Sequence, residues 1–197
     1  GNETPNVKSA SYVKNVFNAL QDLIKKDKIV AGHDVASGGL ITTLLELCFS
    51  DTNLGAELNF NALKESDSIK LLFAENPGIV FQSTDASIEA SLSEACIEFY
   101  KIGAVTSQPT LNIINGAEKF SLNVAELRDV WYETSFLLDQ KQTANGLAQS
   151  RYKNYKNQPL SFKFPQQFTG KLPIKNAANR PKAAIIREKG SNSEREM

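Results

Sequence analysis

The chain has 197 residues, the size of one ordinary domain plus an extension, and 41% of them are apolar, which is enough for a hydrophobic core. Its 22 Lys and Arg balance 22 Asp and Glu, so no charge excess favours nucleic acid or an anionic membrane. No apolar run approaches the ~20 residues of a membrane span. We therefore expect a globular, cytoplasmic protein with no nucleic acid and no membrane as a partner.

Apolar periodicity predicts helices and strands in close succession up to about residue 140. Three-and-four spacing of apolar residues indicates the helices, and alternating or short continuous apolar runs indicate the strands. The segment "NGAE" indicates the turn of a hairpin. Together these patterns predict a layered α/β (α+β) domain, with a buried strand after Pro77. In chain order we expect a helix over 11–27, a strand over 28–34, a helix over 40–48, strands over 56–60 and 78–83, a helix over 88–99, strands over 102–106, 110–114 and 119–124, and a helix over 127–138.

The character of the chain changes after this domain. The following forty residues are rich in Asn, Gln, Lys and Pro without a sustained period, which is typical of an extended linker. "KAAIIRE" then has the continuous apolar run of a strand in a parallel sheet, so we expect residues 182–187 to pack on the domain or on a neighbouring chain. The predicted organisation is a tail over 1–10, a domain over 11–140, a linker over 141–180 and the start of a further domain over 181–197.

The motif "AGHDVASGGL" at 31–40 places a His-Asp pair and two glycines between a predicted strand and a predicted helix. Backbone N–H groups at a helix N-terminus favour anions, and glycines let a phosphate approach the main chain. Asp34 beside this loop is suited to Mg²⁺, which takes one or two carboxylates plus phosphate oxygens. The alternative is structural, with Ser37 as an N-cap, Gly38 and Gly39 in a tight turn, and Asp34 accepting local backbone hydrogen bonds. The spacing is neither Walker A nor G-x-G-x-x-G, so both interpretations stay open.

Other candidate residues have two interpretations each. His33, the one histidine, is either a hydrogen-bonded structural residue or a catalyst. Glu75 either faces the site or is solvated beside the Pro-Gly turn. Trp131, with Tyr132 and Phe136, suggests an aromatic platform, although helical spacing favours a core position for Trp131.

Four segments resemble phosphoribosylformylglycinamidine synthases, the purine-biosynthesis amidotransferases. "IVAGHDVASGGLITTLLELCFS" resembles the "HD-x-S-D-GGL" segment in the second aminoimidazole-ribonucleotide-synthetase-type C-terminal domain of that family. "LLFAENPGIVFQ" is similar to its "LF-x-E-x-x-G" segment, and "NVAELRDVWYETSFLLDQKQ" resembles the helix that closes the domain. "RPKAAIIREKGSNSEREM" resembles the start of the glutaminase domain. This order matches the long single-chain form, and it suggests that the chain is a piece of a longer polypeptide.

The resemblance implies a mixed sheet flanked by helices, partly ferredoxin-like, and a ligase activity. The family converts formylglycinamide ribonucleotide, ATP and glutamine into formylglycinamidine ribonucleotide, ADP, phosphate and glutamate. The resemblance also implies that Asp34 is a Mg²⁺ ligand. The nucleotide-contacting positions fall on Ala36 and Ser37, where Ala36 replaces the family serine and has no hydroxyl to offer a phosphate. The partners implied are ATP or ADP, glutamine, the substrate and the remaining domains of the same chain, and any role of the tail residues depends on those domains: Arg187, Glu188, Gly190 and Asn192.

The two cysteines do not supply the nucleophile that the resembled glutaminase uses. Cys48 and Cys96 lie in segments that look helical, lack C-x-x-C spacing and have no secretory leader upstream, so we expect reduced structural thiols. A nucleophilic Cys requires a positioned base. We therefore expect no catalytic residue and no activity in the chain by itself. Two alternatives to the synthase remain, another ATP-dependent synthetase of the same superfamily and a non-catalytic scaffold, which the Ala36 departure supports.

Overall fold

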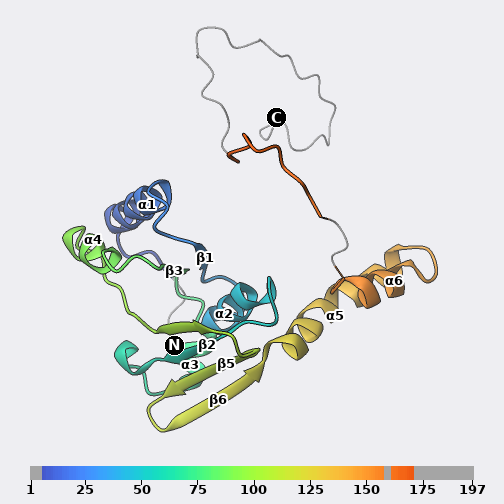
Figure 1. Cartoon of the computed structure of the whole chain (residues 1–197). Helices are drawn as coiled ribbons and strands as arrows, with labels where there is room; N and C mark the ends of the chain where they lie inside the picture. Colours follow the sequence, from blue (N-terminus) through green and yellow to red (C-terminus); the bar gives the residue numbers. More distant parts are fainter. Residues whose placement is uncertain (1–5, 158–160, 171–197) are drawn as a thin grey trace, which may run out of the picture. The chain divides into compact units, whose positions relative to one another are not determined.

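The computed structural model describes residues 6–157 and 161–170, and the chain divides into one unit over 1–154 and a second over 155–197. The predicted further domain over 181–197, including its strand, lies outside the described residues. Within the described residues, all helices and strands belong to the first unit (Figure 1). The fold of that unit therefore positions the candidate site.

A four-stranded mixed sheet forms the larger half of this unit, with the order β4-β2-β5-β6 (Figure 1). β2 and β5 run parallel, with Leu58 opposite Ile113, and both outer pairs are antiparallel. β5 and β6 form the predicted hairpin, and Gly116 supplies the positive φ of 58° at the first position of its loop. The predicted mixed sheet flanked by helices is confirmed. Its strands are β2 (Gly55–Asn59), β4 (Gly103–Thr106), β5 (Thr110–Asn115) and β6 (Glu118–Asn123).

The main core lies between this sheet and the helices α2 (Gly39–Phe49) and α3 (Ser68–Phe73). Burial alternates along β5, because successive side chains of a strand point to opposite faces. Ile41 and Leu44 in the first turns of α2 pack against the sheet, so the start of this helix has a fixed position relative to the sheet. The buried core residues are Ile41, Leu44, Ala56, Leu58, Phe60, Leu72, Leu111, Ile113 and Val124.

A separate two-stranded antiparallel sheet pairs β1 (Ala31–Asp34) with β3 (Ile79–Gln82). The expectation of a buried strand over 78–83 is wrong. Ile79 is 49% exposed, because β3 has β1 as its single neighbour among the described strands. The helices α1 (Ala10–Lys25) and α4 (Ile88–Glu94) lie side by side and share a small core of their own (Figure 1). Its buried residues are Leu23, Ile88, Leu92 and Ile97.

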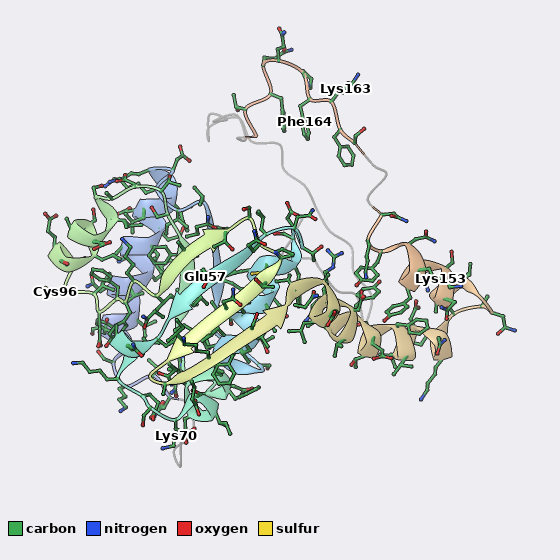
Figure 2. The ribbon with its side chains drawn as sticks, turned by 60° about the horizontal axis from the view of Figure 1, so that its bottom comes forward. Glu57, Lys70, Cys96, Lys153, Lys163 and Phe164 are labelled. Atoms are coloured by element: carbon green, nitrogen blue, oxygen red, sulfur yellow. The ribbon has the colours of Figure 1, made fainter. Side chains whose placement is uncertain are left out.

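The helix predicted over 88–99 is shorter in the structure than its apolar spacing indicates. α4 ends at Glu94, and Cys96 has a positive φ of 54°, which a right-handed helix does not accommodate. The prediction that Cys96 lies in a helix is therefore wrong, and its side chain is exposed after α4 (Figure 2). Cys48 does lie on α2, where burial raises the pKa of its thiol.

The segment predicted as an extended linker begins with helical structure. α5 (Val124–Gln142) runs past residue 140, and α6 (Leu147–Asn154) packs against it. Arg151 of α6 holds Asp139 of α5 through two guanidinium nitrogens, and this pairing stabilises the helical hairpin. The expectation of extended chain is therefore wrong for these residues. No helix in the described part of the chain is long and apolar enough to cross a membrane.

Candidate functional site

The candidate site is the loop that joins the end of β1 to the start of α2. Three hydrogen bonds hold its backbone: Val35 N–H donates to the carbonyl of Gly78 at 2.8 Å, Gly39 N–H donates to the carbonyl of Ala36 at 3.0 Å, and the Thr43 hydroxyl donates to the carbonyl of Asp34 at 2.9 Å. Thr43 is a buried polar residue, and this bond satisfies its hydroxyl. The loop thus has a defined backbone before any ligand binds.

The two glycines of the motif have different tasks. Gly38 is the N-cap of α2 with a φ of 88° and has no side chain with which to cap the helix, so the interpretation of Ser37 as N-cap is wrong. Gly39 has a φ of 74° and lies against the end of α3, where an added Cβ would be 2.7 Å from the backbone carbon of Phe73. The tight turn is confirmed. Gly39 also allows α2 and α3 to approach closely.

The three predicted ligand-contacting residues lie exposed on this loop. The side chain of Asp34 is 75% exposed, and its carboxylate lies 3.4 Å from Nδ1 of His33. Ala36 and Ser37 are exposed as well. A single exposed carboxylate beside a loop that a phosphate can approach is the protein contribution that Mg²⁺ typically receives, because phosphate oxygens and water complete its shell. Asp34 therefore fits a magnesium ligand in its chemistry and accessibility.

Glu75 contacts the loop directly. Its Oε1 accepts a hydrogen bond from the N–H of Gly38 at 2.8 Å, so the interpretation of Glu75 as merely solvated is wrong. A carboxylate at a helix N-terminus is electrostatically favourable. The Gly38 N–H is a donor that a phosphate could use, and Glu75 already accepts from it. A phosphate that bound this N–H would have to displace the Glu75 carboxylate.

His33 contacts Glu46, which lies outside the sequence motif, and the backbone of Asp34 beside it. Its Nε2 is 3.0 Å from Oε2 of Glu46 on α2, and its Nδ1 is 2.7 Å from the carbonyl oxygen of Asp34. Oε1 of Glu46 accepts from Nε1 of Trp131 on α5 at 2.9 Å. The hydrogen-bonded interpretation of His33 agrees with this geometry. Glu46 was missed as a candidate, because in the sequence it is only a polar residue on a predicted helix.

The aromatic residues of α5 divide between two places. Trp131 is 50% exposed and packs on Phe49 of α2 with ring centroids 5.6 Å apart, so its predicted core position is wrong. Tyr132 and Phe136 stack on Tyr152 of α6, at 6.0 and 4.4 Å between centroids, and Tyr132 also stacks on Trp131 at 6.5 Å. Of the three aromatic candidates, Trp131 is the one linked to the loop, through Glu46 and His33.

Residues 2–115, more than half of the chain, match the family model described as AIR synthase related protein, C-terminal domain. The chain belongs to this family. The AIR synthase related domain includes the loop, Glu46, Glu75 and both sheets except for β6. Trp131 lies beyond the matched residues, on α5.

Relatives of this AIR synthase related chain carry the name that the sequence resemblance predicts. The chain is 32% identical to the probable phosphoribosylformylglycinamidine synthase, chloroplastic/mitochondrial, of Arabidopsis thaliana, and 34% identical to the phosphoribosylformylglycinamidine synthase of Dictyostelium discoideum. Both alignments cover 100% of the chain, which spans only 14% and 16% of the length of these relatives. The predicted resemblance is confirmed, for a chain that corresponds to a small part of its relatives.

The fold of the AIR synthase related domain is also that of a solved structure. T. maritima PurL complexed with AMPPCP superposes with a TM-score of 0.53 and 15% sequence identity, over 64% of this chain and 23% of that chain. At this identity the similarity shows the fold.

Proposed function

We propose that this chain forms one wall of a nucleotide site in a phosphoribosylformylglycinamidine synthase. The whole protein would use ATP and glutamine to convert formylglycinamide ribonucleotide to formylglycinamidine ribonucleotide, as a cytoplasmic ligase of purine biosynthesis. The observation that carries the proposal is the exposed Asp34 carboxylate at the end of β1, on a loop whose backbone is held by Gly78 and Thr43. The names of the relatives that align with the whole of this chain support the reaction.

Different residues of the loop would bind the metal ion and the nucleotide. Asp34 would hold Mg²⁺, and the hydroxyl of Ser37 and the main chain at Ala36 would face the nucleotide. When bound, Mg²⁺ neutralises charge on phosphate oxygens. A solved structure of the same fold, T. maritima PurL, is complexed with AMPPCP, which supports a nucleotide as the ligand of this loop.

A second candidate function is a nucleotide site that serves structure alone. Two observations favour it: Ala36 has no hydroxyl where the resembled family has a serine, and Glu75 already accepts from the Gly38 amide. In that case the intact protein would retain nucleotide but would not depend on Asp34 for turnover.

The conversion assay on the intact protein tests the proposal. With ATP, glutamine and formylglycinamide ribonucleotide, we expect Asp34→Asn to lose at least about ten-fold in rate, since it removes a metal ligand. Asp22→Asn, which neutralises an exposed carboxylate on α1, is the matched control and should leave the rate unchanged. The chain of 197 residues alone should release no glutamate from glutamine. Equal rates for Asp34→Asn and the control, or turnover by the chain alone, would contradict the proposal.

A further inference from the structure

The geometry points to Glu46 as a positioning residue that holds Asp34 in place through His33, with Trp131 as its anchor on α5. This inference rests on the proposed function of Asp34. We assign none of these three residues a direct contact with the ligand. They form the His33–Glu46–Trp131 network, which joins β1 to α2 by a histidine–carboxylate contact and α2 to α5 by a side-chain hydrogen bond.

The two carboxylate oxygens of Glu46 have separate partners on separate elements. Oε2 is 3.0 Å from Nε2 of His33, and Oε1 is 2.9 Å from Nε1 of Trp131. An indole N–H only donates and a carboxylate only accepts, so the roles in the Trp131 bond are fixed. The side chain of Glu46 is 26% exposed, so solvent screens these two contacts less than it would screen contacts of a fully exposed side chain. Glu46 therefore has one defined orientation.

The position of the Asp34 carboxylate depends on its backbone, because its side chain is mostly exposed. Two groups hold the Asp34 carbonyl oxygen, the Thr43 hydroxyl at 2.9 Å and Nδ1 of His33 at 2.7 Å. Thr43 is itself part of α2, whereas His33 contacts α2 through Glu46. Without Glu46, the imidazole loses its contact with α2, and one of the two contacts on the Asp34 carbonyl oxygen is weakened.

Core packing reaches the two-stranded sheet through Val80 of β3, which lies opposite His33, whereas no residue of β1 belongs to the main core. The buried residues Ile41 and Leu44 hold α2 to the four-stranded sheet, whereas His33 and Asp34 belong to the two-stranded sheet. Trp131 is held from the side by its ring contact with Phe49. The network thus fixes the end of the small sheet relative to α2, and we expect its loss to affect ligand affinity more than folding.

The chain holds one His and one Trp, so its NMR spectrum contains one imidazole and one indole system that report on the network directly. In the ¹⁵N-labelled chain, Glu46→Gln should move both signals, because the substitution removes the negative charge and replaces one of the two oxygens by an NH₂ group, which only donates. Trp131→Phe keeps an aromatic ring but removes the N–H, and it should move the His33 signals through Glu46. Glu133→Gln, an exposed position on the same helix, is the control and should move neither. Unchanged His33 signals in Trp131→Phe would overturn the network.

Binding of Mg²⁺-ADP by the intact protein tests the positioning role. Glu46→Gln and Trp131→Phe should weaken binding by about ten-fold, the usual effect of losing a partner that orients a metal ligand, with an unchanged urea midpoint. Glu46→Asp, which keeps the charge but shortens the reach, should weaken it less than Glu46→Gln. Wild-type affinity in both variants, with weakened binding in Asp34→Asn, would overturn the inference and leave the proposed function intact. Wild-type affinity in Asp34→Asn would instead contradict the proposed function itself.

Discussion

Alanine at Gly39 is expected to destabilise the domain by about 2–5 kcal/mol, through the cost of a left-handed conformation and of overpacking. Gly39 has a φ of 74°, and an added Cβ would lie 2.7 Å from the backbone carbon of Phe73 and 2.8 Å from the carbonyl oxygen of Leu72. These are main-chain atoms of α3, which cannot rotate away. Relief therefore requires α2 and α3 to separate, and the core that they share would loosen.

Gly38 provides the matched comparison, because its φ of 88° is equally unfavourable for alanine. There, an added Cβ would meet the hydroxyl of Thr42, a side chain that can rotate. We expect Gly38→Ala to cost only about 1–2 kcal/mol. Urea unfolding followed by circular dichroism measures both variants. Equal losses in the two variants would mean that close approach to α3 is not the reason for the second glycine.

Phe60→Ala is expected to cost about 3–5 kcal/mol, the usual effect of removing a large buried ring. Phe60 is 0% exposed and lies in the main core directly after β2, where its N–H donates to the carbonyl of Ile114. Its loss leaves a cavity between the sheet and α2. Phe17→Ala on α1, where the ring is 60% exposed, should change the free energy of unfolding by less than about 1 kcal/mol. A similar loss in both variants would contradict this assignment of the core.

The elements that the sequence predicts well have strong local patterns. Alternation in "TLNIIN" and the "NG" turn predict β5 and the hairpin, because burial of every second residue and a positive φ are local requirements. The sequence does not predict α3, because its six residues are too few to show a helical period of apolar residues. Asp67 caps this helix by accepting from the N–H groups of Ile69 and Lys70. α6 buries only Ala148, so no apolar face marks it.

The pairing of elements and the links around the site depend on contacts between distant residues. Two separate sheets form because β3 pairs with β1 rather than with the four-stranded sheet, and composition does not specify a partner. The motif predicts the loop between a strand and a helix with Asp34 beside it, because these are local features. The bond between Glu46 and Trp131 joins residues 85 positions apart, and the bond between Gly38 and Glu75 joins residues 37 apart. No spacing rule within a single segment reveals such contacts.

Calorimetric titration of the intact protein with ADP, with and without Mg²⁺, tests the central claim most directly. The account predicts that Mg²⁺ strengthens nucleotide binding in the wild type and in the Asp22→Asn control. In Asp34→Asn this Mg²⁺-dependent gain should fall by at least about ten-fold, because the carboxylate at the end of β1 is the proposed link between metal and protein. A gain in Asp34→Asn equal to that of the wild type would contradict the assignment of this loop as the magnesium-nucleotide site.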